Sequence, residues 1–303
     1  MSAREKRAGE GASAQALRTH GHCVVPAALP TDAIAALDAD FAPHFAETPF
    51  CEGDFYGRRT KRFGALLTRS PLAEQLVGHP LILGLAKTML GPWCDQIALN
   101  LTQAVEIHPG ASAQFPHRDQ DMWGGDKGTI EYLVNVMWPL VPFTPDNGAT
   151  RLWPSSHRMA PDSVLPEAEA VPVPLMPGDA LVFLGSTLHG GGENRSGAPR
   201  RGVIVSYCLG WLKPFELQWL VYPPCVARHF DRELAALVGY QIHRPNLGNV
   251  EGQCPSVLLE AEVPAHRPAI DALRPDQAAA LADYVARTEN DDCAEEGDDR
   301  AGR

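Results

Sequence analysis

The chain has 303 residues, 45% of them hydrophobic and 21% charged, which is the composition of an ordinary soluble globular protein. Its formal net charge of -11 argues against a nucleic acid as a partner, because phosphate binding needs a basic face. No apolar run is long enough for a membrane span, and the charged N-terminus lacks the apolar region of a secretory signal. We therefore expect no membrane partner and a cytoplasmic location.

The two ends of the chain differ from its middle in composition. Residues 1–13 are small and polar, and we expect them to be disordered. A C-terminal helix is expected at residues 266–288, followed by a disordered acidic tail at residues 289–303. Residues 14–265 contain no internal repeat and no convincing linker, which indicates one domain with helical additions.

The N-terminal part of this domain predicts one short strand and two helices. The strand is expected at residues 21–26, and apolar residues at helical spacing predict helices that begin near Thr31 and cover residues 71–90. Residues 50–69, between these helices, are irregular, aromatic and basic. They are either a solvated loop or a lid over a substrate.

The sequence from residue 96 to residue 212 changes to short β-rich runs separated by Pro, Gly, Asn and Asp. Many short strands with evenly spaced turns predict a mainly β protein with flanking helices. We expect its core to be a double-stranded β-helix, that is, a jelly-roll of cupin-like type. The expected strands are residues 96–108, 115–122, 131–140, 150–154, 170–175, 180–184 and 202–212.

The candidate chemistry is centred on His117 and Asp119, in one of the expected strands. Residues two apart in an extended segment point to the same side, so this imidazole and carboxylate can meet at one point. A second histidine would complete the facial triad of a non-haem Fe(II) oxygenase. His189 is the natural choice, because a turn and an apolar strand precede it.

A second His-x-Asp pair, His229 and Asp231, is expected to be unrelated to this chemistry. It lies in residues 226–238, where apolar residues recur at helical spacing. Residues i and i+2 of a helix diverge, so these two side chains cannot hold one ion. The polar loop that follows, residues 240–250, is a second candidate for a lid.

An oxygenase that uses a 2-oxo acid also needs a fixed cation for the distal carboxylate of that acid. Arginine suits this role because its planar fork matches a carboxylate and stays charged when buried. Arg200 and Arg201 open the β-rich run that follows His189. Strand alternation would turn one of them inward and the other outward, and the pattern alone does not decide between them.

The order of these motifs resembles the phytanoyl-CoA dioxygenase (PhyH-like) family of Fe(II)/2-oxoglutarate-dependent oxygenases. The resemblance spans about residues 21–211 and rests on Gln-x-x-His-x-Asp, on residues 147–157, on Pro-Gly-Asp, and on His-x4-Asn-x-Ser-x3-Arg. It implies that iron is bound by His117, Asp119 and His189. It also favours Arg200 over Arg201 for 2-oxoglutarate. Further polar contacts to 2-oxoglutarate or the pocket wall fall on Gln114, Asn135 and Thr150.

The resemblance implies a dioxygenase that uses Fe(II), 2-oxoglutarate and O2, with ascorbate as a reductant in vitro. We expect the substrate to be a hydrophobic small molecule of secondary-metabolite type, because the phosphates of an acyl-CoA would favour a basic entrance. The expected reaction is hydroxylation or a related C–H oxidation such as desaturation, epoxidation or rearrangement. Candidate substrate contacts are Trp123, Met137 and Trp211.

The alternative to an oxygenase is a cupin-type metal-dependent isomerase or hydrolase, or a non-catalytic small-molecule binder. These proteins do not need an arginine eleven residues after the last metal ligand, and many use three histidines without a carboxylate. Asp119 and Arg200 are therefore the residues that favour the oxygenase. The sequence leaves the oligomeric state open between a monomer and a homodimer.

Overall fold

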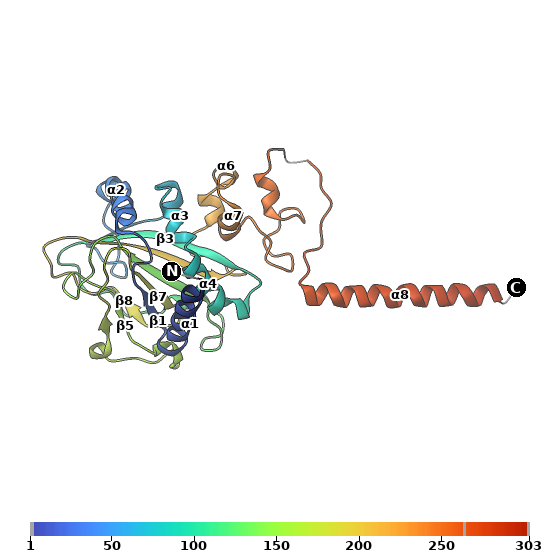
Figure 1. The fold of residues 1–303 in the computed structure, drawn as a ribbon, viewed down its shortest axis with the longest axis horizontal. Helices are drawn as coiled ribbons and strands as arrows, with labels where there is room; N and C mark the ends of the chain where they lie inside the picture. The colour runs from blue at the N-terminus through green and yellow to red at the C-terminus, as the bar shows by residue number, and fades with distance from the viewer. Residues whose placement is uncertain (1–2, 263–264, 302–303) are drawn as a thin grey trace. The chain divides into compact units, whose positions relative to one another are not determined.

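The computed structural model describes residues 3–262 and 265–301, and the side chains of residues 9–262 and 265–288. By its internal contacts the chain forms two compact units, Met1–Gly239 and Tyr240–Arg303, and every strand among the described residues lies in the first unit. The helices of this unit are α1 (Ala3–His20), α2 (Thr31–Glu47), α3 (Ala73–Val77), α4 (Pro80–Leu90), α5 (Gln218–Val221), α6 (Pro224–Ala227) and α7 (Arg232–Leu237) (Figure 1). Its strands are β1 (His22–Val25), β2 (Thr60–Phe63), β3 (Ile97–Ile107), β4 (Leu133–Pro139), β5 (Arg151–Leu152), β6 (Val171–Pro172), β7 (Ala180–Leu184), β8 (His189–Gly190) and β9 (Arg200–Leu209).

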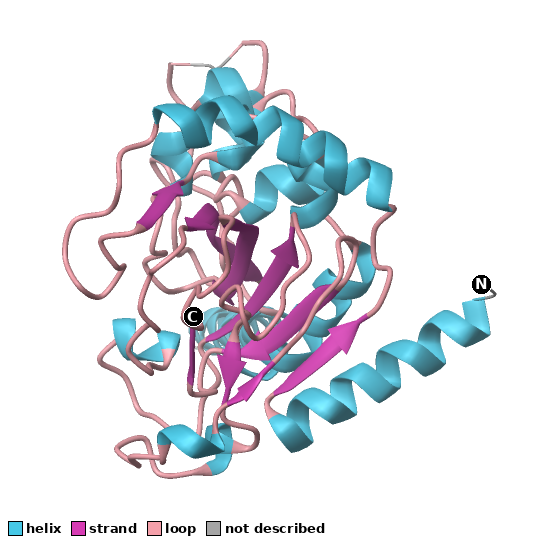
Figure 2. Cartoon of the chain, turned by 90° about the vertical axis from the view of Figure 1, so that its left-hand side faces the viewer, coloured by secondary structure: helices cyan, strands magenta, loops and turns pink. Residues whose placement is uncertain are grey.

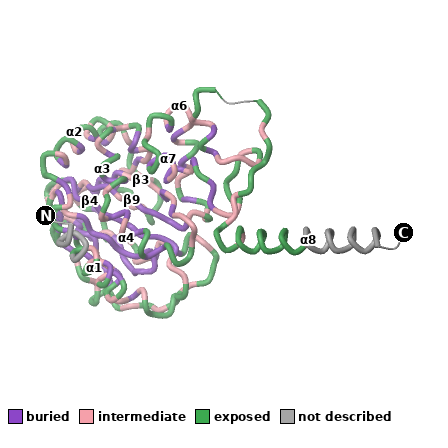
Figure 3. Tube along the Cα trace, turned by 45° about the vertical axis from the view of Figure 1, so that its right-hand side comes forward, coloured by how far each residue is buried: buried purple, intermediate pink, exposed green. Residues whose placement is uncertain are grey.

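The strands form two antiparallel sheets. The larger sheet has the order β1-β7-β4-β9-β3-β2, and the smaller one has the order β6-β5-β8. All residues of β4 and β7 are buried, and these central strands read as nearly continuous apolar runs because both of their faces are covered (Figure 3). Helix α4 packs against β3, β4 and β9, while loops and the smaller sheet complete the core (Figure 2). The predicted jelly-roll core with flanking helices is confirmed.

The prediction of a strand at residues 115–122 is wrong for most of its length. Only His117 is paired, in an isolated bridge, and Asp119–Met122 is a 3-10 helix. Pro116 has no N–H to donate, and the Gln120 N–H donates instead to the Gly185 carbonyl at 3.2 Å, so the ladder does not continue on either side.

Two predicted helices are interrupted. The one expected at residues 71–90 is divided into α3 and α4 at Gly78 and His79, and Pro80 begins α4 at a position that tolerates proline. The one expected at residues 226–238 is divided into α6 and α7. Asp231 is the N-cap of α7 and accepts a hydrogen bond of 2.8 Å from the Leu234 N–H, so its carboxylate caps a helix.

Both predicted disordered ends are helical where the structure describes them. Residues 3–13 belong to α1, whose Ala14 and Leu17 are buried and which packs against β1 and α4. In the second unit, α8 (Pro275–Ala301) begins later than the helix expected at residues 266–288 and continues through the acidic run. Alanine and glutamate favour helix in both segments, which composition-based disorder did not capture. Residues 1–2 and 302–303 of the two predicted ends lie outside the described residues.

No described helix has both the length and the apolar character that a membrane span requires.

Candidate active site

His117 and His189 come together because their backbones pair. Each N–H donates to the other residue's carbonyl at 3.0 Å, in an antiparallel bridge. Residues directly opposite each other in such a pair project their side chains from the same face. The two ring centroids are therefore only 4.4 Å apart.

Asp119 completes this cluster from the next turn of chain. Arg118 is extended, so His117 and Asp119 point to the same side although the strand ends there. The Asp119 carboxylate lies 3.4 Å from Nε2 of His117 and 3.5 Å from Nε2 of His189. One ligand atom from each residue lies within 4.8 Å of the other two. Two imidazole nitrogens and one carboxylate oxygen in this arrangement can bind one metal ion and leave other positions open.

Backbone carbonyls orient both imidazoles. Nδ1 of His117 donates to the Phe115 carbonyl at 2.8 Å, and Nδ1 of His189 donates to the Thr187 carbonyl at 3.1 Å. A carbonyl can only accept, so in both neutral rings the proton is on Nδ1 and Nε2 offers its lone pair. Such second contacts set the tautomer and the direction of metal-binding histidines.

The surroundings of the cluster favour the metal-binding charge state of Asp119 and His189. Burial raises the pKa of Asp119, but His189, His117 and a hydrogen bond of 2.9 Å from Asn135 lower it to about 2. Burial is the main cause that lowers the pKa of His189 to about 4. Burial also lowers the pKa of His117, but the hydrogen bond and charge of Asp119 outweigh it and raise the value overall. A carboxylate therefore stands beside a neutral His189 at neutral pH.

The cluster opens into a cavity of about 390 Å³. Phe55, from the segment at residues 50–69, lies over His117 with ring centroids 5.0 Å apart. Most of the remaining wall is apolar and comes from the larger sheet. Its apolar residues include Leu101, Val105 and Ile107 of β3, Met137 of β4, Phe183 of β7 and Ile204 of β9.

Arg200 lies at the same cavity and is only 1% exposed. Its Nε donates to the Gly148 carbonyl at 3.2 Å, and its guanidinium lies 4.0 Å from the centroid of the Phe143 ring. Its Nη1 has no hydrogen-bond partner among the described residues. Burial, and then Arg62, lower the pKa of Arg200 to about 9, which still leaves it charged at neutral pH. A buried cation with an open hydrogen-bonding nitrogen fits the carboxylate of a ligand.

Arg201 points to the other face of β9. It pairs across the sheet with Glu106, and its Nε donates to that carboxylate at 2.6 Å. Its second ion pair, of 3.4 Å, is with Asp38 of α2. These two carboxylates hold the Arg201 side chain outside the cavity.

The three other polar residues singled out from the sequence also line the cavity. Gln114 accepts from the Gly191 N–H at 3.2 Å and donates to the Phe55 carbonyl at 3.3 Å, so it joins two loops. Asn135 donates to Asp119. The Thr150 hydroxyl is buried and has no hydrogen-bond partner in the described part of the chain.

Of the three candidate substrate contacts, only Met137 lines this cavity. The Trp123 indole donates to the Lys213 carbonyl at 3.0 Å and stacks against Tyr132. The Trp211 indole donates to the Trp93 carbonyl at 2.9 Å. Trp123 falls outside because the 3-10 helix after Asp119 redirects the chain, which the expected strand would not have done.

Arg62 is a cavity residue that the sequence reasoning did not single out. It lies in β2, which pairs with β3, and its Nη1 donates to Gln103 at 2.9 Å. The only sequence signal was the basic and aromatic character of residues 50–69, which here form part of the cavity wall. Residues 240–250 belong to the second unit, and their role as a lid stays a prediction.

The jelly-roll core and the His-x-Asp…His cluster define a cupin-fold non-haem metalloenzyme. The family model described as Phytanoyl-CoA dioxygenase (PhyH) matches residues 17–202. The chain belongs to this phytanoyl-CoA dioxygenase family, as the motif order implied, and is an oxidoreductase of the dioxygenase class. The family match gives no support to an isomerase, a hydrolase or a non-catalytic binder.

Curated relatives cover most of the chain. "Dioxygenase FrzG" of Cladobotryum sp is 30% identical over 276 residues, which are 80% of this chain and 89% of that protein. "Multifunctional dioxygenase ausE" of Aspergillus calidoustus is 28% identical, over 75% of this chain and 82% of that protein. Among solved structures, the epimerase SnoN in complex with Fe3+, alpha ketoglutarate and nogalamycin RO superposes with a TM-score of 0.57 at 20% identity. That match covers 71% of this chain and 90% of SnoN, and it supports the fold.

Proposed function

We propose that this protein is an Fe(II)/2-oxoglutarate-dependent dioxygenase that oxidises a C–H bond of a hydrophobic small molecule of secondary-metabolite type. One observation carries the proposal. The three-residue cluster of His117, Asp119 and His189 opens into the same cavity as Arg200, a buried cation without an anionic partner among the described residues.

The residues present fit both groups that this reaction needs. The imidazole and carboxylate donors suit Fe(II). The Arg200 Nη1 and the Thr150 hydroxyl are buried polar atoms at the cavity without partners among the described side chains, and a carboxylate of 2-oxoglutarate would satisfy both. The dianion would also offset the positive charge of Arg62 and Arg200.

When bound, iron and 2-oxoglutarate supply the oxidising chemistry, in which O2 is consumed and 2-oxoglutarate becomes succinate and CO2. The chain contributes orientation and the exclusion of water. The carbonyls of Phe115 and Thr187 direct the imidazoles, and Asn135 holds the carboxylate of Asp119. Phe55 covers His117 on the side of the cavity and limits the access of water.

The cavity wall supports a hydrophobic substrate. Side chains of β3, β4, β7 and β9 make most of it apolar, and Met137 is the candidate substrate contact that lies there. Arg62 adds one cation that can orient a polar oxygen of the substrate. Hydroxylation, desaturation, epoxidation and rearrangement all use this arrangement. The cytoplasmic location and the monomeric or homodimeric state stay predictions.

The test is 2-oxoglutarate turnover by the full chain with Fe(II) and ascorbate, across a panel of hydrophobic metabolites. We expect succinate that depends on iron and is stimulated by at least one metabolite. Asp119→Ala should remove this activity, because the metal loses its only carboxylate ligand, while Asp146→Ala, whose side chain is 79% exposed, should retain it. Succinate formation by Asp119→Ala at the rate of the unmodified protein would overturn the assignment.

A further inference from the structure

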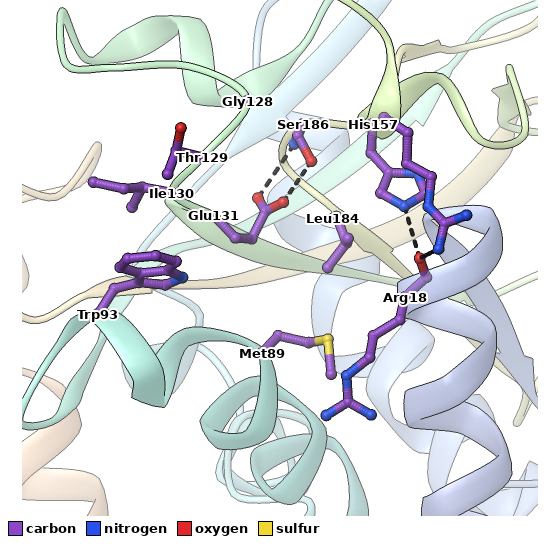
Figure 4. Close-up of a pocket in the computed structure, with 11 residues that line it drawn as sticks. Arg18, Met89, Trp93, Gly128, Thr129, Ile130, Glu131, His157, Leu184 and Ser186 are labelled. Atoms are coloured by element: carbon purple, nitrogen blue, oxygen red, sulfur yellow. Dashed lines mark hydrogen bonds between the residues drawn. The ribbon is translucent and has the colours of Figure 1, made fainter.

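A second cavity, of about 420 Å³, lies in the first unit and shares no lining residue with the metal-site cavity. It opens between α1, the end of α4 and the loop that leads into β4 (Figure 4). The side chains that matter for its chemistry are Arg18, Met89, Trp93, Glu131, Arg158 and Ser186. None of them has a part in the proposed oxidation.

One pole of this cavity carries a half-buried carboxyl group. Glu131 accepts hydrogen bonds from both the N–H and the hydroxyl of Ser186, the former at 3.3 Å (Figure 4). No ion pair joins it to a cation among the described side chains, and Lys127 on the same loop donates instead to the carbonyls of Gln120 and Trp123. Burial raises the pKa of Glu131 to about 7, against the hydrogen bonds from Ser186, although the charge of Lys127 interacts with it.

The other charged groups of the cavity are basic. Arg18 reaches from α1 toward Met89, and no hydrogen bond or ion pair engages its guanidinium within the described part of the chain (Figure 4). Arg158 and His157 both bond the Arg18 carbonyl, at 2.7 Å and 3.1 Å, which fixes the 3-10 helix Ser156–Arg158 against α1. Two guanidinium groups therefore line the cavity together with a single carboxyl group.

The wall between these groups is apolar. Trp93 is 40% exposed and Met89 is nearly buried, and with Leu184 and Ile130 they offer an aromatic and aliphatic surface (Figure 4). A purely anionic ligand would leave Glu131 without a partner. A purely cationic ligand would face Arg18 and Arg158.

We propose that this second cavity binds a small zwitterion whose ammonium group and carboxylate are separated by an apolar body. The ammonium group pairs with Glu131, the carboxylate pairs with Arg18, and the body packs on Trp93 and Met89. The ligand supplies the cation that Glu131 lacks and the anion that Arg18 lacks.

A hydrogen bond connects the walls of the two cavities. Ser186 lines the second cavity, and its carbonyl accepts from Nε of Arg118 at 3.0 Å. Arg118 lines the metal-site cavity and lies between His117 and Asp119 in the chain. Glu131 is thus linked through Ser186 to Arg118, which lies between two of the three candidate metal ligands.

The test is calorimetric titration of the full chain with three probes of nearly equal shape. They are para-(aminomethyl)benzoate, para-methylbenzylamine, which lacks the carboxylate, and para-methylbenzoate, which lacks the ammonium group. The measurement is made at about pH 8, where Glu131 is ionised. We expect the zwitterion to bind about tenfold more tightly than either singly charged probe, since each pole adds one charge-assisted pair.

Two variants assign the poles. Glu131→Gln should abolish the tighter binding of the zwitterion relative to para-methylbenzoate. Arg18→Gln should reduce the tighter binding of the zwitterion relative to para-methylbenzylamine. The matched controls Glu193→Gln and Arg195→Gln, which are 53% and 60% exposed, should keep both preferences. Equal binding of the three probes, no binding of the zwitterion, or its displacement by 2-oxoglutarate would each overturn the proposal.

Discussion

Arg200→Met tests the most specific part of the proposed site. Methionine keeps much of the apolar volume of the side chain and removes the guanidinium that faces the cavity. Loss of one partner of a buried charge pair weakens ligand binding by about 3 kcal/mol, so we expect the Kd and KM for 2-oxoglutarate to rise roughly a hundredfold. Arg200→Lys keeps the charge without the planar fork. Its Kd and KM for 2-oxoglutarate should therefore lie between those of the unmodified protein and those of Arg200→Met.

The same substitution should leave the unliganded fold nearly as stable as before. The lowering of the pKa of Arg200 from its ordinary value to about 9, by burial and then by Arg62, corresponds to roughly 5 kcal/mol of unfavourable free energy for its charged form, which methionine removes. Methionine also loses the bond to the Gly148 carbonyl, worth about 2 kcal/mol, and the contact with the Phe143 ring, worth about 2 kcal/mol. These contributions nearly cancel.

The assay is a pair of measurements on each variant, the Kd for 2-oxoglutarate in metal-loaded protein and the urea midpoint without ligand. We expect a large change in the first and a change of no more than about 1 kcal/mol in the second. An unchanged affinity for 2-oxoglutarate would refute the role of Arg200. A large loss of stability in Arg200→Met without ligand would show that Arg200 stabilises the fold and is not primarily a ligand-binding residue.

Three further predictions follow from other contacts. Asn135→Leu removes the amide donor to Asp119 and should weaken metal binding by about tenfold to a hundredfold, as measured by metal titration; an unchanged metal affinity would exclude this supporting role. Phe55→Ala uncovers His117 and should form more succinate per oxidised product, so an unchanged ratio counts against the covering role. Burial raises the pKa of Glu131 to about 7, so the folded protein binds a proton that the unfolded chain releases near pH 4.5, and stability falls as the pH rises through this window. In Glu131→Gln the urea midpoint should no longer fall as the pH rises through this window. Identical pH profiles of the urea midpoint for this variant and the unmodified protein would contradict the prediction.

The sequence by itself determined the class of fold and the centre of the site. Short β-rich runs with regular turns indicated the jelly-roll, because alternation and turn residues are local properties that are readable along the chain. His117 and Asp119 point to the same side because Arg118 between them is extended, and this also depends only on local geometry. His189 was found from the turn and apolar strand that precede it, although the pairing partner that brings it to His117 was not predictable.

Only the tertiary structure decided what lies inside the cavity. The pattern of neighbouring arginines could not distinguish Arg200 from Arg201, and the β3–β9 register resolves them by burying one and pairing the other with Glu106. Arg62 reaches the cavity through a strand that looked like an irregular loop, and Trp123 leaves it through a 3-10 helix that looked like a strand. Each of these outcomes depends on hydrogen bonds between segments far apart in the chain, which compete with local preference and which no short stretch of sequence contains.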